Sequence, residues 1–300
     1  MLTPREIIAE SWRITTTERT LRGWGFFRTI FALLLDLKLL AYQLYFLYSW
    51  VADKEVGLLD DWEWLYHNTP LWAFLTIIIG FLLLVLVELF IPSLGDGAII
   101  GLAAKAYKKE KVEGGFILGL YNYFAILTLH EIFAFSGISI FITACSLILR
   151  YTSGLRWGLL VVATLLWIIS SILRFFASFS EEGVVIQKLG VFEAAGRSIK
   201  LTVSYLSHIV FLALLMMVIG LRIVINAVVI IVLPAVLFGL GTVLTLFLAP
   251  VVAWTIIAVV GLIAVFFLAY GLTYLNVFKQ TVWTIMFIEM NKQRDLDAIG

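Results

Sequence analysis

The stretch LWAFLTIIIGFLLLVLVELFIP, residues 71–92, decides the fold class of this chain. Glu88 is its only charged residue, so a helix built from it offers no side to water. At about 1.5 Å of rise per residue, roughly 20 such residues cross the hydrocarbon core of a bilayer. The whole chain is 62% hydrophobic and only 14% charged, well outside the balance of a soluble domain. We therefore predict an all-α protein, a polytopic bundle of transmembrane helices.

Apolar windows of similar length recur along the chain and define its predicted domains. We predict about six spans, near residues 25–50, 71–92, 122–149, 155–177, 208–232 and 251–277. They form a transmembrane domain over 25–277, between a cytoplasmic amphipathic segment, 1–24, and a cytoplasmic C-terminal segment, 278–300. Pro234 and Pro250 leave a second interpretation open, in which a re-entrant piece or an extra short span precedes the last crossing.

The Lys and Arg residues predict the orientation of these spans. Cytoplasmic flanks of membrane proteins carry an excess of both residue types. Most of the 21 in this chain fall in residues 1–23, 93–120 and 174–206 and in the C-terminal tail. We therefore expect a multi-pass protein of the cell membrane with both termini in the cytoplasm. The opposite loop, 51–70, is acidic and carries the Trp and Tyr residues that favour a membrane interface.

A polar interruption between two apolar runs, KLGVFEAAGRSIKLTVSYLSH at residues 188–208, is the most informative part of the chain. Its apolar residues recur every three or four positions, as one helical face requires: Phe192, Ala195, Ile199, Val203 and Leu206. The candidate headgroup-contacting residues are Glu193, Arg197, Ser198 and Lys200. We predict an amphipathic helix in the headgroup plane, with its cations toward anionic lipid. The alternative is a linker that only anchors two spans.

A second basic connector, KKEKVEGGF from Lys108, repeats this organisation earlier in the chain. Its Glu113 and two glycines take the place of Glu193 and two alanines, and an apolar run follows each. We predict a second amphipathic connector helix here, and an internal pseudo-repeat of span, connector and span. The candidate headgroup-contacting residues of this connector are Lys108, Lys109 and Lys111.

Residues 184–214, VVIQKLGVFEAAGRSIKLTVSYLSHIVFLAL, resemble the membrane domain of bacterial glycerophosphoryl diester phosphodiesterases and of related uncharacterised six-span membrane proteins. The residues that carry the resemblance are Gly190, Glu193, Ala194, Arg197, Ser198 and Leu201. Two positions depart from the family pattern, because Gln187 replaces an acid and Leu206-Ser207-His208 replaces an aromatic residue. The resemblance implies a six-span membrane domain. We expect no esterase activity, since these 300 residues contain no phosphodiesterase catalytic domain.

Ionisable residues inside predicted spans are costly in lipid and therefore mark candidate sites. Four of them fall near the cytoplasmic ends of the second, third and fourth spans: Glu88, His130, Glu131 and Arg174. We predict that they pack as one intramembrane polar cluster. Three interpretations stay open: ion pairs that hold the spans together, a headgroup or proton-relay site, and a metal site. The metal site is the weakest, because HExxH spacing and cysteine ligands are both missing.

The sequence contains none of the catalytic motifs that we sought. It has no GxSxG elbow, Walker loop or GxGxxG turn, and its single cysteine, Cys145, excludes an intrachain disulfide. We predict a non-enzymatic membrane protein, without cofactor or nucleic acid, that engages anionic headgroups or a membrane protein partner through its connectors. A homo-oligomer stays open. The alternative function is a transporter or permease with a polar intramembrane site, and an intramembrane enzyme ranks third.

Overall fold

The computed structural model describes residues 2–51, 60–151 and 154–297, and this part of the chain contains helices but no β-strand. The elements in chain order are α1 (Pro4–Thr17), α2 (Arg19–Val51), α3 (Asp60–Asn68), α4 (Leu71–Tyr107), α5 (Gly115–Ile132), η1 (Ala134–Ser136), α6 (Ile138–Tyr151), α7 (Arg156–Phe176), α8 (Ser180–Gln187), α9 (Val191–Ser204), α10 (Leu206–Leu244) and α11 (Pro250–Asp297). The prediction of an all-α polytopic helix bundle is confirmed.

Helix α1 begins where the sequence supplies a cap. The Thr3 hydroxyl accepts a hydrogen bond from the Glu6 N–H, and the Glu6 carboxylate accepts one from the Thr3 N–H at 2.7 Å. This reciprocal pair satisfies two donors at the helix end. The bond from the Thr3 backbone, with a second from its hydroxyl, holds the pKa of Glu6 below its usual value. Ile7 and Ile14 share the buried face of α1, which packs against α11.

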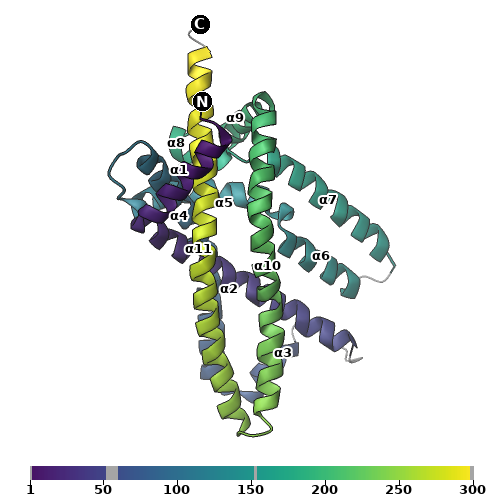
Figure 1. The fold of residues 1–300 in the computed structure, drawn as a ribbon. Coiled ribbons are helices and arrows are strands. Elements are labelled where there is room, and N and C mark those ends of the chain that lie inside the picture. Colours follow the sequence, from purple (N-terminus) through teal and green to yellow (C-terminus); the bar gives the residue numbers. More distant parts are fainter. Residues whose placement is uncertain (1, 52–59, 152–153, 298–300) are drawn as a thin grey trace.

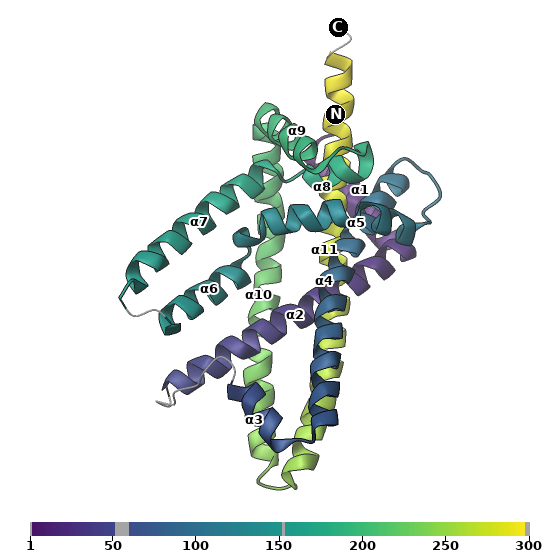
Figure 2. The same cartoon turned by 180° about the vertical axis from the view of Figure 1, so that it is seen from behind.

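Two helical hairpins and one oblique helix give the molecule its shape. Helices α10 and α11 run antiparallel, and their turn lies at the end of the molecule opposite both termini (Figure 1). Because α10 is continuous to Leu244 and α11 begins at Pro250, the chain places neither a re-entrant piece nor an extra span between them. Helices α6 and α7 form a second hairpin that projects sideways, and α2 crosses the long helices obliquely (Figure 2).

Four stretches of the described chain are long and apolar enough to cross a membrane: Leu71–Tyr107, Gly115–Ile132, Arg156–Gln187 and Pro250–Gln293. Helix α9 and the first turns of α10 make a fifth if this bent pair is counted as one span. The predicted third span, 122–149, is not one helix, since the short η1 and Gly137 separate α5 from α6. The count of six spans stays a prediction.

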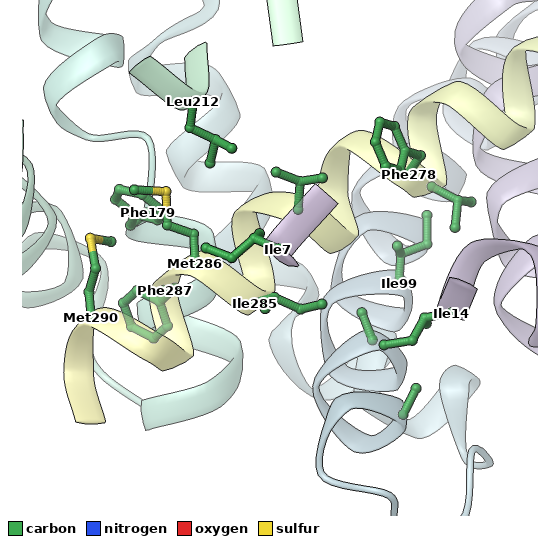
Figure 3. Packing of buried hydrophobic residues seen from close by; sticks show 14 of the residues in the cluster. Ile7, Ile14, Ile99, Phe179, Leu212, Phe278, Ile285, Met286, Phe287 and Met290 are labelled. Atoms are coloured by element: carbon green, nitrogen blue, oxygen red, sulfur yellow. The ribbon is translucent and has the colours of Figure 1, made fainter. Parts of the chain in front are cut away.

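The largest buried apolar cluster lies at the end of the molecule that holds both termini. There α1, the second half of α4 and the last turns of α11 bury side chains such as Ile7, Ile99 and Phe287 against one another (Figure 3). The predicted domain boundaries, at residues 24/25 and 277/278, therefore fall inside packed helices. By contrast, the first half of α4 and the first half of α11 expose many Leu, Ile, Val and Phe side chains, as lipid-facing segments do.

The crossing of α4 and α5 depends on glycine. A Cβ atom at Gly119 would lie 2.3 Å from the Leu94 carbonyl oxygen, and one at Gly97 would lie 3.2 Å from the Gly119 Cα. Only residues without a side chain let two helix backbones approach this closely. The crossing brings the middle of α4 against α5, and the polar residues described below lie beside it.

The predicted connector helix after Lys108 is not formed. Helix α4 ends at Tyr107, and the next helix begins at Gly115. Lys109 (φ 60°) and Gly114 (φ 82°) both adopt the left-handed conformation between them, which terminates right-handed helices. The segment 108–114 is therefore an irregular loop that carries the predicted cations without a helical face.

Candidate functional site

Helix α9 lies nearly perpendicular to the first turns of α10 that follow it. The two axes, over Val191–Ser204 and Leu206–Met217, differ by 93°. The helix lies at the same end of the molecule as both termini (Figures 1 and 2). Because an α-helix advances by about 100° per residue, its side chains divide into three faces, each with a different environment.

The first face of α9 is buried, chiefly against α8 and the end of α7. Its residues are Ala194, Ser198, Leu201 and Thr202. The Ser198 hydroxyl accepts a hydrogen bond from the Phe179 N–H at 2.9 Å and donates one to the Phe176 carbonyl at 3.0 Å. The Thr202 hydroxyl donates to the same carbonyl at 3.1 Å. Ser198, a predicted headgroup contact, is thus 1% exposed and fixes the direction of α9.

The second face of α9 is apolar and exposed. Phe192 is 83% exposed and Val203 is 59% exposed, and Ile199 lies between them on the same stripe. Leu206, which the sequence assigned to this face, begins α10 instead. Three of the five residues that the sequence assigned to the apolar face thus form the exposed stripe, and Ala195 lies half-buried at its edge. Single exposed apolar residues are common on proteins, but a continuous stripe along a helix indicates an interaction surface.

The third face of α9 is polar, and its cations differ in their surroundings. Glu193 and Lys200 are exposed. The Arg197 guanidinium turns toward α11, where Nη2 donates a hydrogen bond to Asn291 Oδ1 at 3.1 Å. Gln187, at the end of α8, donates to the same oxygen at 3.1 Å. No ion pair among those described joins Glu193 to Arg197. The hydrogen bond from Arg197 to Asn291 instead connects α9 to α11.

The loop 108–114 presents the other predicted cations at the same end of the molecule as the termini (Figures 1 and 2). Lys108, Lys109 and Lys111 are all exposed. The loop is held from within, since Lys105 Nζ donates to the Glu113 carbonyl at 3.0 Å and Lys111 pairs with the Glu113 carboxylate at 2.8 Å. Lys108 and Lys109, by contrast, take part in none of the described ion pairs.

The two connectors share one backbone feature. Lys188 ends α8 with φ 59°, close to the value of Lys109, and Gly190 and Gly114 then precede α9 and α5. Lys188 Nζ lies 4.9 Å from the centroid of the Tyr121 ring, and partial burial lowers the pKa of this lysine. The acid of each connector occupies a different place, because Glu193 lies within the helix and Glu113 lies before it.

A network of buried charges joins α2, α4, α5 and α8 near the α4–α5 crossing. Arg28 Nε donates to Asp96 Oδ1 at 2.9 Å, and the Asp96 side chain is only 5% exposed. His130 Nε2 lies 3.2 Å from Glu181 Oε1 and 3.8 Å from Asp96 Oδ2. The Nδ1 atom of the same ring lies 3.4 Å from the Ser93 hydroxyl. The histidine therefore bridges two carboxylates that come from different helices.

Further polar side chains surround this network. Glu182 Oε1 accepts a hydrogen bond from Gln280 Nε2 at 3.1 Å. Its second carboxylate oxygen is buried and has no hydrogen-bond partner in the described part of the chain. Lys279 and Arg174 lie within electrostatic range of Glu181. The network thus extends from α2 to α11. It contains acidic and basic side chains in similar numbers.

The structure distributes the four predicted cluster residues among separate environments. His130 lies in the network, and Arg174 acts on it electrostatically. Glu88 forms an ion pair with Lys38 of α2, and no described hydrogen bond or ion pair joins Glu88 to the network. Glu131 turns instead into an apolar groove of about 520 Å³ between α4 and α5, with Phe90 and Tyr123 among its walls.

Sequence reasoning missed Arg28, Asp96 and Glu181 as members of the site. Arg28 lies inside the predicted first span, 25–50, and Asp96 and Glu181 lie in the basic segments 93–120 and 174–206, where charged residues cost little. A signal was present, because Gly95 and Gly97 flank Asp96 and indicate close helix packing. In the described residues, no group of three or more His, Cys, Asp or Glu side chains has the geometry to hold a metal ion.

Comparison with known proteins leaves the architecture without a named relative: no family model, no curated protein and no solved structure matches this chain. The resemblance to the membrane domain of glycerophosphoryl diester phosphodiesterases therefore stays a prediction.

Proposed function

We propose that this protein is a non-enzymatic protein of the cell membrane that engages anionic lipid headgroups on the cytoplasmic side through α9 and the loop 108–114. The observation that carries the proposal is the orientation of α9. A helix perpendicular to the one that follows it, with an exposed apolar stripe, fits the plane of a membrane interface.

The three faces of α9 match the three surroundings of an interfacial helix. The face with Ser198 packs on the protein, the face with Phe192 and Val203 enters the acyl boundary, and the face with Lys200 meets headgroups and water. Insertion of an apolar stripe gains roughly 25 cal/mol per Å² removed from water. Lys200, Lys108 and Lys109 each add about 1 kcal/mol of attraction at an anionic surface.

Lipid composition around the purified full-length protein tests the proposal. We expect mass spectrometry of co-extracted lipid to show anionic lipid enriched over the bulk membrane. The enrichment should fall in a variant with Lys108→Gln, Lys109→Gln and Lys200→Gln. Arg13→Gln is the matched control, because Arg13 is already paired with Glu10 at 2.5 Å. Lipid of bulk composition around the unmodified protein would contradict the proposal.

A second candidate function, proton-coupled transport, is favoured by the charge network. Glu182 places one unpartnered carboxylate oxygen inside the bundle, next to the bridge that His130 makes between Asp96 and Glu181. Such chains of acids and histidines carry protons in membrane transporters. In liposomes under a potassium diffusion potential, transport predicts a proton flux that Glu182→Gln abolishes. A flux equal to that of protein-free liposomes would remove this candidate.

A further inference from the structure

A groove of about 430 Å³ lies where α2 crosses α11, on a part of the molecule that includes neither α9 nor the loop 108–114. Helix α2 contributes Arg19, Arg22, Gly23, Phe26 and Phe27, and α11 contributes Phe266, Tyr270, Thr273 and Tyr274. Two cations, two phenols and three phenylalanines thus line one hollow, and no carboxylate lines it.

The polar residues of the groove lie at one end of it. Helix α11 ends at the end of the molecule that holds both termini, and α2 runs obliquely away from that end as the chain proceeds from Arg19 (Figure 1). Arg19 and Arg22 therefore lie nearer that end than Phe26 and Phe27. In the same way Tyr274 lies nearer that end than Phe266. The groove is therefore cationic at the end nearer the two chain termini and aromatic at its opposite end.

The guanidinium of Arg22 is held in place by one hydrogen bond, but not all of its donors have a partner in the protein. Its Nη1 donates to the Tyr274 hydroxyl at 2.6 Å, and its guanidinium carbon lies 5.4 Å from the centroid of that ring. Its Nε is buried and finds no hydrogen-bond partner among the described residues. Arg19 is exposed beside it. Because a buried donor without a partner is costly, this arginine is suited to receive an anion.

The aromatic part of the groove is open to the surroundings of the bundle. Phe26 and Phe266 pack edge to face with ring centroids 5.3 Å apart. Phe27 is 55% exposed, and Phe266 and Tyr270 are exposed to a similar degree. Exposed aromatic rings beside α11, a helix long and apolar enough to cross a membrane, form a surface for an apolar chain.

We propose that this groove binds one anionic phospholipid, whose phosphate lies against Arg19 and Arg22 and whose acyl chain lies along Phe26, Phe27 and Phe266. An anion at one end and a hydrocarbon chain at the other match the order of residues in the groove. Arginine binds phosphate oxygens through several parallel N–H donors, and the Tyr270 hydroxyl, 3.3 Å from that of Tyr274, adds a further donor.

The test is native mass spectrometry of the full-length, delipidated protein in detergent, titrated with phosphatidylglycerol, phosphatidylcholine or glycerol 1-phosphate. We expect one tight phosphatidylglycerol site and binding of phosphatidylcholine at least tenfold weaker. Arg19→Gln and Arg22→Gln should each weaken phosphatidylglycerol binding about fivefold. Arg13→Gln should leave it unchanged. Phe266→Ala should also weaken it, since the acyl chain loses a ring.

Three outcomes would overturn the proposal. These are equal affinity for the two phospholipids, displacement of phosphatidylglycerol by glycerol 1-phosphate, or an Arg19→Gln protein that binds like the unmodified one. Arg19 is exposed and so can be changed without loss of packing, which keeps the test decisive if Arg22→Gln fails to fold. Lys200→Gln should leave this single-lipid binding intact, so failure of the function proposed for α9 and failure of this site give different results.

Discussion

Arg197 and Ser198 show how residues with the same predicted role take different places. Both lie in the basic connector, where sequence alone assigns them to lipid headgroups. In the fold, the Ser198 hydroxyl accepts a hydrogen bond from the backbone N–H of Phe179, just before α8. Arg197 donates a hydrogen bond to Asn291 of α11. A helical pattern identifies a face, but the neighbours of that face come from segments distant in sequence.

The Arg28–Asp96 pair is the residue-scale test of the charge network. Asp96→Ala leaves the guanidinium of Arg28, which is 29% exposed, without its carboxylate. We expect the free energy of unfolding to fall by about 3 kcal/mol, as for other ion pairs broken on one side. Thermal and denaturant unfolding in detergent measure the change.

The double variant Arg28→Leu with Asp96→Leu provides the control for this prediction. Because it removes both charges, we expect it to be more stable than Asp96→Ala alone. Losses that simply add between the single variants would show that the two residues do not act as a pair.

At the scale of helices, the sequence predicted where an amphipathic helix lies better than where a helix is interrupted. The pattern over 190–206 predicted a helix there, and α9 occupies 191–204. The same reasoning predicted a helix after Lys108, where Lys109 and Gly114 instead take left-handed conformations. Periodicity reports which side of a helix is apolar, but one left-handed residue ends the helix without changing the pattern.

The glycine at the α4–α5 crossing gives a prediction at this scale. Gly119→Ala places a Cβ against the Leu94 carbonyl, so we expect destabilisation of about 1–3 kcal/mol from overpacking. Gly158→Ala in α7 is the matched control, since a Cβ there meets nothing within 4 Å. Thermal unfolding of both variants in detergent should show a loss for Gly119→Ala alone. Equal stability of the two would contradict the close crossing.

At the scale of the whole molecule, hydropathy predicted the class of fold but not its interior. Lipid and protein core both favour apolar side chains, so hydropathy ended the second span at residue 92 but did not predict that the rest of α4 is a buried helix. Nor could it bring Arg28, His130 and Glu181 together, because their proximity depends on helix crossings. The Glu88–Lys38 pair was missed for the same reason.

The predicted topology has a direct test at this scale. In a Cys145→Ala background, we expect a membrane-impermeant maleimide to label His67→Cys on intact cells. Lys109→Cys and Lys292→Cys should react only after the membrane is permeabilised, because positive flanks face the cytoplasm. Labelling of Lys292→Cys on intact cells would place the C-terminus outside and contradict the predicted orientation.

The placement of α9 at a membrane interface is the central claim, and spin-label accessibility along this helix tests it most directly. Nitroxides would be attached at Phe192, Val203, Glu193 and Ser204 of the Cys145→Ala protein in anionic lipid bilayers. The account predicts that oxygen reaches positions 192 and 203 better than a water-soluble nickel reagent does, with the opposite preference at 193 and 204. Equal, water-like accessibility at all four positions would contradict it.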